Sequence, residues 1–466
     1  MPHVAIIGAY GSAGAAVAGE LADEPGVELT LVDDGEPGGG LCILRGCMPS
    51  KEVLSAGAHR FQARHDHRLV GDLPDVDLER VVATKDEHVS SFAEHRRSSI
   101  HELAERENVE FVHDTARFVD DRVIAVGGET IEPDYVVIAT GSVLNVPELP
   151  GMEDVSFMSS ADVLDATDLP DSGLVMGFGY IGMELVPYIA EAGTSLTVVE
   201  HDDRPIDEAD APFGDAALDI YEDNWDIDVL RNTHEKRLEQ MDDGGVRLYV
   251  TDEDGDEQVH EADELFLFTG RHPNLDSLDL SNTALDPEAD WVEDTMQARD
   301  DERVFVVGDA NGREPILHVA KEQGFTAADN VLAHDRGEAL THYENVHHHV
   351  IFSGLGVYPF ARVGHSKESA EAAGLDFVHV SREASDDGVF KTKDVPEGLA
   401  SLVVDADDGT VLGYQGLHYH ADVMAKTMQL AVEMGLDVRE VPDRSYHPTT
   451  PEILDGLFRE AADSLE

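Results

Sequence analysis

The sequence predicts an α/β fold with two copies of one strand–turn–helix–strand unit and a C-terminal α+β domain. Two observations predict this fold. A buried strand, a glycine-rich turn, a helix and a second strand ending in an acidic residue occur in residues 4–33 and again in residues 174–200. From about His342 the sequence changes to short strands, with helices expected around 421–434 and 451–461. A chain of 466 residues, 42% of them hydrophobic, is too long for one core and indicates about three or four domains.

The first copy predicts a dinucleotide-binding site. The strand Val4–Ile7 leads into a glycine turn, and a helix over 15–22 and a strand over 28–32 follow. Glycines let the backbone approach a pyrophosphate, the helix N-terminus attracts its charge, and an acid after the second strand holds ribose hydroxyls. The residues expected to do this are Gly8, Gly11, Gly14 and Asp33. Compared with Gly-x-Gly-x-x-Gly the turn has one extra residue, which we assign to Tyr10.

The second copy fits the same pattern fully. A strand over 174–176 precedes the turn, a helix extends to about Ala192, and the strand Ser195–Val199 follows. The residues expected to bind the second dinucleotide are Gly177, Gly179, Tyr180, Gly182 and Glu200. A carboxylate at Glu200 accepts hydrogen bonds from a ribose and repels a 2′-phosphate, so NAD(H) is favoured. Arg204 lies close to Glu200 in the sequence, so NADP(H) stays an alternative to NAD(H).

Cys42 and Cys47 are the only cysteines of the chain, and their surroundings predict a redox-active pair. The ring between them can close as a disulfide if Gly46 relaxes the backbone and a helix begins near Cys47. A helix start would direct N–H groups at sulfur and stabilise a thiolate, and Lys51 adds positive charge. The alternatives are a structural disulfide or two inert buried thiols.

The charge of the chain limits its partners. With 97 acidic and 32 basic side chains, the net charge is −65, which makes nucleic acid and anionic membranes poor partners. The acid is spread along the chain and predicts a solvated surface that needs salt screening, as in proteins of extreme halophiles. The N-terminus has no signal-like region and no apolar run reaches membrane-spanning length, so we expect a cytoplasmic protein.

Other segments predict the remaining secondary structure. Residues 51–108 are expected to be helical, and short strands are expected over 111–119 and 122–131. Buried strands over 135–142 and 304–309 each end in a small turn. We predict no metal site, because neither C-x2-C pairs nor a Cys/His zinc pattern occurs. The adjacent histidines 347–349 would alternate faces in a strand and cannot converge on one ion.

The segment Cys-x4-Cys-x-Pro-Ser-Lys resembles the active-site segment of the class I pyridine nucleotide–disulfide oxidoreductases, which include dihydrolipoamide dehydrogenase, glutathione reductase and mercuric reductase. The resemblance covers essentially the whole chain. It implies an FAD domain (1–150 and 271–340), an inserted NAD(P) domain (151–270) and an interface domain (341–466). The fold would be α/β with two Rossmann-like units, and the protein a homodimer.

The resemblance also implies roles for single residues. Cys42 would exchange with the substrate, and Cys47 would contact the flavin. Lys51 would pair with Glu184 near the flavin, and Tyr180 would cover the nicotinamide pocket. Further cofactor-binding positions by resemblance are Thr140, Gly141, Gly270 and Asp309. His447, oriented by Glu452 in the segment His-Pro-Thr-x-x-Glu, would move protons for the cysteine pair of the partner subunit.

The substrate stays open between several classes. Glu200 and the His447–Glu452 pair favour a dihydrolipoamide dehydrogenase, whose partner would be a lipoyl domain or a small dithiol. The alternative is a reductase of a γ-glutamylcysteine- or glutathione-type disulfide. It stays open because the chain departs from the family pattern at Tyr10 and 43–45 and has Ser445-Tyr446 in place of the usual second histidine. Mercuric reductase is disfavoured because a further C-terminal cysteine pair is missing. Outside catalysis, a flavin-bound NADH sensor or a structural subunit are alternatives.

Overall fold

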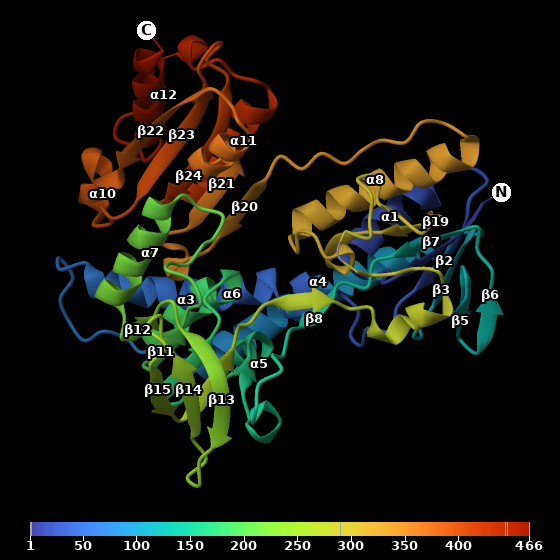
Figure 1. The fold of residues 1–466 in the computed structure, drawn as a ribbon, viewed down its shortest axis with the longest axis horizontal. Coiled ribbons are helices and arrows are strands. Elements are labelled where there is room, and N and C mark those ends of the chain that lie inside the picture. The colour runs from blue at the N-terminus through green and yellow to red at the C-terminus, as the bar shows by residue number, and fades with distance from the viewer. Residues whose placement is uncertain (1, 289, 443, 445, 466) are drawn as a thin grey trace. The chain divides into compact units, whose positions relative to one another are not determined.

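The computed structural model describes residues 2–288, 290–442, 444 and 446–465, so Ser445 lies outside the described residues. The chain forms two compact units (Figure 1). Unit 1 contains Met1–Pro49, Thr84–Asn145 and Arg271–Asn345, and unit 2 contains Ser50–Ala83, Val146–Gly270 and Val346–Glu466. Both units combine helices and sheets, which confirms the predicted α/β class. The three-domain boundaries expected from the sequence stay a prediction.

Unit 1 is built on a six-stranded sheet of order β18-β19-β7-β1-β2-β3. Its strands are β1 (His3–Ile7), β2 (Glu28–Val32), β3 (Val109–Val112), β7 (Tyr135–Ile138), β18 (Gln297–Ala298) and β19 (Asp301–Val306). Neighbours pair in parallel, apart from β18 with β19. The residues that follow β1, β2, β7 and β19 therefore lie along one edge of the sheet, where dinucleotides bind in open α/β folds.

Two hydrophobic cores cover the faces of this sheet. Val4 and Ile6 of β1 pack with the helices α1 (Ser12–Ala22) and α8 (Leu317–Arg336), whereas Ala5 and Ile7 face the opposite core. A three-stranded antiparallel sheet contributes to that opposite core through Phe118 and Ile124. Its strands are β4 (Arg117–Asp120), β5 (Val123–Val126) and β6 (Glu129–Ile131), and a separate pair is formed by β8 (Ser142–Leu144) and β17 (Arg271–Pro273). The side chains of β1 alternate between the two cores, and because both faces are covered its residues from Val4 to Ile7 are all apolar.

The first half of unit 2 contains the second predicted copy. Its parallel sheet has the order β12-β11-β10-β16-β9. The strands are β9 (Met158–Ser159), β10 (Ser172–Met176), β11 (Ser195–Val199), β12 (Ile227–Leu230) and β16 (Glu264–Leu267), with helices α5 (Ser160–Asp165), α6 (Tyr180–Glu191) and α7 (Ala211–Asn224). An antiparallel sheet that the sequence analysis did not predict follows: β13 (His234–Gln240), β14 (Val246–Thr251) and β15 (Glu257–Ala262).

The C-terminal part of unit 2 has an antiparallel sheet of order β20-β21-β24-β23-β22. Its strands are β20 (His348–Ile351), β21 (Phe360–Gly364), β22 (Phe377–Glu383), β23 (Leu399–Asp405) and β24 (Val411–Leu417). Its helices are α9 (Lys367–Ala372), α10 (Gly388–Lys393), α11 (Ala421–Glu433) and α12 (Glu452–Ser464). Met424 and Met428 of α11 and Ile453 and Leu457 of α12 share one core with the sheet, as expected of an α+β domain.

Two expectations about local structure are refined. The region 51–108 contains two long helices, α3 (Cys47–His65) and α4 (Leu78–Leu103), rather than one continuous segment. The strand expected over 122–131 is divided into β5 and β6, because Gly127 and Gly128 adopt positive φ angles between them.

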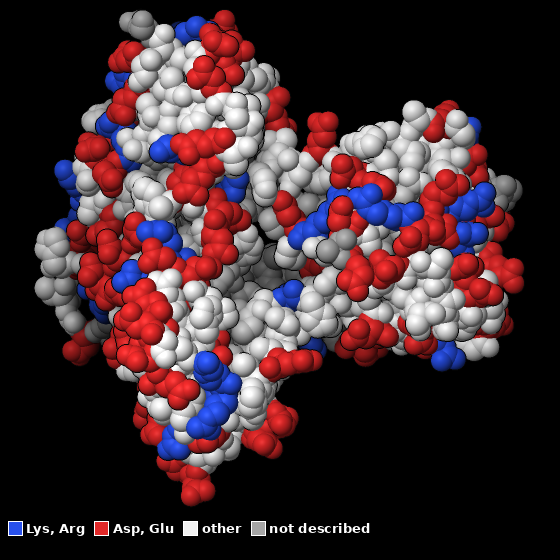
Figure 2. Space-filling model, viewed as in Figure 1, with Lys and Arg blue, Asp and Glu red and all other residues white. Residues whose placement is uncertain are grey.

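The acidic composition is visible on the surface of both units, where Asp and Glu side chains cover much of the face seen in Figure 2. Basic side chains occur in smaller groups among them. In the part of the chain that the structure describes, no helix combines the length and apolar character that crossing a bilayer requires.

Candidate active site

The two cysteines lie at the junction of two helices in unit 1. Cys42 is the second residue of the short helix α2 (Leu41–Leu44), and Cys47 is the first residue of α3, as predicted. A Cβ atom on Gly46 would lie 3.1 Å from the Cα atom of Cys42, so glycine permits the tight return between them. Cys42 is half-buried and Cys47 is exposed. The chain therefore presents both sulfurs within one compact turn.

The two thiols differ in their tendency to ionise. A side-chain hydrogen bond with Cys47, together with burial, raises the pKa of Cys42. Cys47 begins a 19-residue helix, and backbone N–H groups at a helix start favour a thiolate. This arrangement favours the negative charge on Cys47 while Cys42 holds its proton. Cys42 then needs help to become a nucleophile.

Lys51 and Glu184 form the ion pair expected from the sequence. Lys51 lies in α3, Glu184 lies in α6, and their charged atoms are 2.7 Å apart. Glu184 also accepts a hydrogen bond of 3.1 Å from the backbone N–H of Phe352, and the Lys51 ammonium lies 4.4 Å from the Phe352 ring centroid. Lys51 and the Phe352 N–H thus fix the Glu184 carboxylate, and the Phe352 ring holds the Lys51 ammonium from another side.

The glycine turns of the two copies pack on the backbone in the same way but differ in length. A Cβ on Gly8 or Gly177 would lie 2.3 Å or 2.5 Å from the backbone oxygen of the neighbouring strand's end. Gly14 and Gly182 in turn pack on the backbone oxygens of Gly8 and Gly177. The spacing is six residues in the first turn and five in the second. The extra residue expected in the first turn is therefore confirmed.

The residues around the first turn form a polar cradle in unit 1. The Asp33 carboxylate accepts N–H bonds of 2.8 Å from Tyr10 and 2.9 Å from Gly35, and burial raises the pKa of Asp33. The Thr140 hydroxyl is buried and has no hydrogen-bond partner among the described residues. Gly141, next to it, has a φ of +72°. A tight glycine turn, an orphaned buried hydroxyl and an acid at one sheet edge fit a bound dinucleotide such as FAD.

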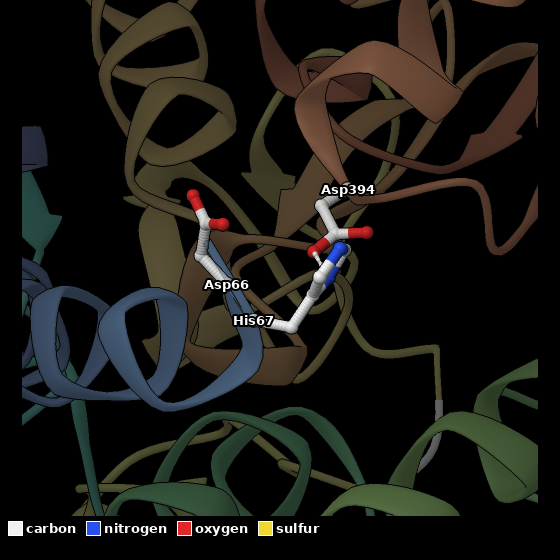
Figure 3. A group of neighbouring side chains, drawn as sticks. All are labelled: Asp66, His67 and Asp394. Atoms are coloured by element: carbon white, nitrogen blue, oxygen red, sulfur yellow. Dashed lines mark ion pairs between the residues drawn. The ribbon is translucent and has the colours of Figure 1, made fainter. Parts of the chain in front are cut away.

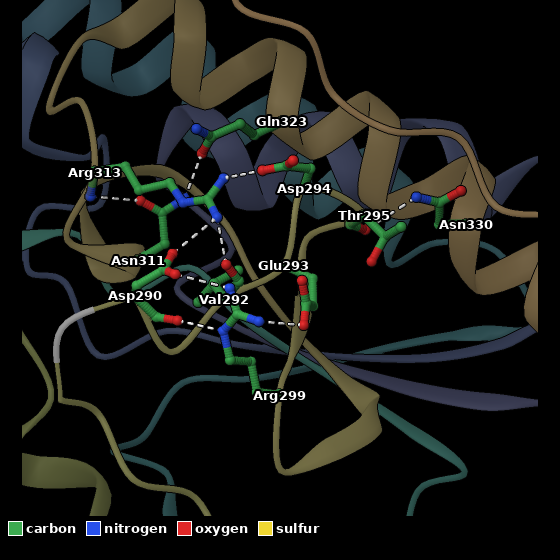
Figure 4. A network of polar contacts seen from close by, with 10 residues as sticks. All are labelled: Asp290, Val292, Glu293, Asp294, Thr295, Arg299, Asn311, Arg313, Gln323 and Asn330. Atoms are coloured by element: carbon green, nitrogen blue, oxygen red, sulfur yellow. Dashed lines mark hydrogen bonds and ion pairs between the residues drawn. The ribbon is translucent and has the colours of Figure 1, made fainter.

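Asp309 lies in a turn that is fixed from two sides. The Ser142 hydroxyl donates to its carboxylate at 2.6 Å, and the Arg271 Nε donates to the same hydroxyl at 2.9 Å. Gln323 accepts hydrogen bonds of 2.8 Å from the Gly308 N–H and the Asn311 amide, which anchors the turn to α8. Figure 4 shows this anchor within a network of ten residues. Asp309 is therefore held at the sheet edge, and among the described residues only one of its carboxylate oxygens accepts a hydrogen bond.

That network also connects the turn to neighbouring segments of unit 1. Arg313 donates its backbone N–H to Asn311 at 3.0 Å and forms an ion pair of 2.9 Å with Asp294 (Figure 4). Asn330 bonds the backbone oxygens of Thr295 and Thr341. None of these side chains was predicted, because their partners lie in separate segments of the sequence.

The second turn has the features expected of an NAD(H) site. Gly179 precedes α6, Gly270 has a φ of +82°, and the Glu200 carboxylate accepts the Asp202 N–H at 3.0 Å. Burial raises the pKa of Glu200. Arg204 is already neutralised, because Asp215 and Asp203 lie 2.8 Å and 2.9 Å from its guanidinium. The cation that kept NADP(H) open in the sequence thus has two carboxylate partners.

Tyr180 at the start of α6 belongs to a cluster that the sequence did not reveal. Its hydroxyl donates to Glu208 at 2.6 Å, and the Nε2 atom of His349 lies 2.9 Å from the other carboxylate oxygen. The Tyr180 ring is 40% exposed, whereas the His349 side chain is 5% exposed. Burial alone would raise the pKa of Glu208, but His349, Tyr180 and Arg362 lower it, so the carboxylate stays charged.

His447 and Glu452 are brought together as the motif predicted. The His447 Nδ1 atom lies 3.1 Å from the Glu452 carboxylate, and Glu452 is the first residue of α12. The Thr449 N–H donates to the same carboxylate at 2.9 Å, and the peptide bond between His447 and Pro448 is cis. The His447 side chain is 78% exposed, so its outer nitrogen is accessible.

One group of side chains in unit 2 has the spacing of a metal site. Asp66, His67 and Asp394 offer ligand atoms within 4.8 Å of one another (Figure 3). The Asp66 carboxylate, however, already forms hydrogen bonds of 2.6 Å and 2.7 Å with Arg68. An ion would have to compete with that bidentate pair, which makes this a surface charge cluster rather than a built site.

Comparison with known proteins agrees with this architecture. Residues 2–324 match the family described as pyridine nucleotide-disulphide oxidoreductase, and residues 350–457 match the dimerisation domain of that family. Dihydrolipoyl dehydrogenase of Haloferax volcanii is 29% identical and aligns over 95% of this chain and 92% of that protein. Dihydrolipoyl dehydrogenase 2 of Haloarcula marismortui is 30% identical, over 95% and 93%.

Two other proteins are similar over nearly the whole chain. Mercuric reductase of Staphylococcus aureus is 27% identical, over 94% of this chain and 78% of that protein. The solved structure of the HOCl-induced flavoprotein disulfide reductase RclA from Escherichia coli has a TM-score of 0.82 at 22% identity and covers 98% of this chain and 99% of that one. At this identity the structural likeness supports the fold.

Proposed function

Because this chain belongs to the pyridine nucleotide-disulphide oxidoreductase family, whose members use FAD and NAD(P)H, we propose that it exchanges electrons between NAD(H) and a dithiol or disulfide through Cys42 and Cys47. The observation that carries this proposal is the pair itself. Cys47 opens a long helix, and its side chain is hydrogen-bonded to Cys42. Two sulfurs that share one hydrogen bond at a helix start are suited to opening and closing a disulfide.

The cofactor sites have defined residues in this proposal. Gly8, Gly14, Asp33, Thr140 and Asp309 would hold FAD, since they form the polar cradle at the edge of the first sheet. The nicotinamide dinucleotide would be held by Gly177, Gly179, Gly182 and Glu200, with Gly141 and Gly270 providing the turns that close the two sites. When bound, FAD supplies the electron transfer between the nicotinamide and the cysteine pair.

The protein's own residues carry the sulfur chemistry. In the reductive direction the Cys42 thiolate attacks one sulfur of the substrate disulfide, the substrate S–S bond breaks, and the leaving thiolate takes a proton from His447 of the partner subunit. The Cys47 thiolate then attacks the Cys42 sulfur, which closes the Cys42–Cys47 disulfide and releases the second substrate sulfur as a thiolate that takes a proton from solvent. Two electrons pass from the cysteines to the substrate. Oxidation of a dithiol is the reverse sequence, with His447, held by Glu452, accepting the proton.

Dihydrolipoyl groups are the first substrate class that we propose. The identity of 29–30% with two dihydrolipoyl dehydrogenases supports this class, as does the neutralised Arg204 near Glu200, which favours NAD(H). The second class is the disulfide of a small thiol of the γ-glutamylcysteine or glutathione type. Mercury reduction is disfavoured, because the sequence has no cysteine pair beyond Cys42 and Cys47.

The test is steady-state turnover of the purified holoenzyme with NAD+ and dihydrolipoamide, and with NADH and a panel of disulfides. We expect turnover with at least one of these, and none in Cys42→Ser. Partial reduction should produce a long-wavelength charge-transfer absorbance band that Cys47→Ser abolishes and Cys42→Ser retains. If the band disappears in Cys42→Ser and persists in Cys47→Ser, the two roles are reversed. A yellow, NADH-reducible protein without turnover would instead support the redox-sensor alternative.

A further inference from the structure

The extra residue of the first glycine turn, Tyr10, is not explained by the proposed function. Its ring is 3% exposed and fills the space above Gly38, where a Cβ atom would lie 2.2 Å from the ring. Its backbone N–H donates to Asp33 at 2.8 Å, and its hydroxyl lies 2.8 Å from His101 Nε2. The insertion therefore joins the turn to the glycine segment that leads into the cysteines.

The backbone oxygen of Tyr10 has a partner of its own, which is Arg96. The Arg96 guanidinium, on α4, donates to this oxygen at 3.0 Å. A Cβ atom on Gly40 would lie 3.2 Å from the same oxygen, and Gly40 immediately precedes the helix that contains Cys42. One turn earlier in α4, Ala93 packs on Gly39. The helix thus rests on the glycine segment and holds Arg96 beside the start of α2.

Arg96 has no carboxylate partner among the described residues, a feature that it shares with its neighbour Arg97. In the same unit Arg106 pairs with Asp23 and Arg122 pairs with Asp301. Arg96 is half-buried, yet among the described residues it has no carboxylate within ion-pair distance, although the chain contains 97 of them. A half-buried, uncompensated guanidinium costs desolvation free energy, so it is retained where another negative charge is expected.

We propose that Arg96 stabilises the thiolate of Cys42 during exchange, and that the inserted Tyr10 provides the carbonyl that holds Arg96 in place. This inference rests on the proposed function and adds a residue to it. Cys42 is the cysteine that keeps its proton in the pair, because Cys47 is favoured as the thiolate. The charged groups that act on Cys42 are Cys47, which raises its pKa, and Arg96, which lowers it. Arg96 thus opposes the effect that makes Cys42 a poor nucleophile.

The test measures alkylation of Cys42 by iodoacetamide in reduced holoenzyme carrying Cys47→Ser, from pH 6 to pH 10, with peptide mass spectrometry to identify the modified residue. A nearby cation favours the charged form of a thiol, so Arg96→Gln should slow alkylation of Cys42 at pH 7 by about three- to tenfold. The rate limit at high pH should not change, because the thiolate itself is unaltered. Arg96→Lys keeps the charge and should stay within about threefold of the parent.

Arg97→Gln is the matched control. Arg97 is the next residue of α4, is also half-buried, and donates to the Gly38 backbone oxygen at 3.5 Å, but it is not among the groups that act on Cys42. Its removal should leave the profile of Cys42 unchanged. An unchanged profile in Arg96→Gln, or an equal shift in Arg97→Gln, would overturn the inference. Loss of bound flavin in both Arg96→Gln and Arg96→Lys would assign Arg96 to the cofactor instead.

These outcomes are separate from those of the proposed function. If the parent enzyme turns over thiols and Arg96→Gln alkylates like the parent, the role of Arg96 alone is rejected. If no dithiol or disulfide is turned over, the proposed function is rejected whatever the alkylation profile shows.

Discussion

The hydrogen bond between Tyr180 and Glu208 should control access of NADH to its site. The family resemblance implies that Tyr180 covers the nicotinamide pocket, so its side chain would have to move when NADH binds. Its hydroxyl donates to a charged carboxylate at 2.6 Å, and the His349 Nε2 atom lies 2.9 Å from the other oxygen of that carboxylate. Breaking this bond is therefore part of the free energy of NADH binding.

The magnitude follows from the type of bond. Hydrogen bonds to a charged group contribute about 1.5–3 kcal/mol and neutral ones about 0.5–1.5 kcal/mol. Glu208→Gln replaces the bond to a charged group with a neutral one. The state in which Tyr180 is bonded to residue 208 should therefore be less stable by about 1 kcal/mol, or about fivefold in population. Tyr180→Phe removes the bond, and because the ring is 40% exposed we expect about 1–2 kcal/mol rather than the upper value. Both changes should lower the KM for NADH and leave the kcat for disulfide reduction unchanged.

The assay is steady-state kinetics at varied NADH, with stopped-flow measurement of flavin reduction. Tyr249→Phe is the matched control, since Tyr249 in the same unit donates to Glu239 at 2.9 Å on the antiparallel sheet. In a double-mutant cycle, Tyr180→Phe with Glu208→Gln should cost no more than the larger single change. An unaltered KM in both variants, or an equal effect of Tyr249→Phe, would refute the reasoning.

The effect of the Tyr180–Glu208 hydrogen bond on the KM for NADH has a pH dependence of defined sign. The pKa of Glu208 is lowered below its ordinary value, so the carboxylate is charged throughout the neutral range. A depressed carboxyl pKa contributes stability that is present above the unfolded value and is lost only as the pH falls through the folded value. The contribution of Glu208 to the KM for NADH should therefore be constant from pH 6 to pH 8 and change only in acid.

Three further predictions concern salt, the nicotinamide and the dimer. With a net charge of −65, the melting temperature should rise between 0.1 M and 3 M KCl, because the screening length falls from about 10 Å at 0.1 M to about 3 Å at 1 M; a constant melting temperature would contradict this. The kcat/KM should be higher with NADH than with NADPH, and Glu200→Gln should narrow the ratio; a preference for NADPH in the parent enzyme would show that the carboxylate does not decide. His447→Gln should keep flavin reduction by NADH and lose about 10²- to 10⁴-fold in thiol turnover. Mixing it with Cys42→Ser after dimer dissociation should restore up to about one quarter of the activity, and no recovery in confirmed heterodimers would place the histidine outside the partner's site.

Much of the fold could be predicted because its signals are local. The strand Ser195–Val199 was predicted with the bounds that it has, since a buried apolar run between a helix and an acidic residue leaves little freedom. The helix start at Cys47 was expected from the close spacing of the two cysteines, and the pairs Lys51–Glu184 and His447–Glu452 follow from motifs that the resemblance supplied. In each case a short stretch, or two matching stretches, contained the information.

The antiparallel sheet β13–β15 was not predicted because its sequence gives a mixed signal. In β14 the buried residues Val246, Leu248 and Val250 alternate with more exposed ones, but β15 is mostly polar and exposed along its length. A strand that is solvated on both faces has no hydrophobic period to detect. Its pairing with β14 is set by register across a turn rather than by burial of its own side chains.

The polar clusters could not be predicted for a different reason. His349 was considered only as one of three adjacent histidines, and β20 does place His348 and His349 on opposite faces, as a strand requires. The sequence does not show that the buried side chain of His349 contacts Glu208, which lies in a separate segment of the same unit. Contacts of this kind depend on how the sheets pack, and a single sequence without its fold does not encode them in any local pattern.

The inserted residue Tyr10 shows how a local departure acquires meaning through packing. By spacing alone, a residue added to a glycine turn only weakens a motif. In the folded chain it places one more carbonyl at the turn, and that carbonyl accepts a hydrogen bond from Arg96. A side chain at Gly38 would collide with the Tyr10 ring, and a Cβ atom at Gly40 would make a tight contact of 3.2 Å with the Tyr10 carbonyl oxygen. The inserted Tyr10, the glycine segment 38–40 and Arg96 therefore form one arrangement that leads into the helix of Cys42. The positive charge of Arg96, which no carboxylate among the described residues neutralises, is the basis of the role proposed for it.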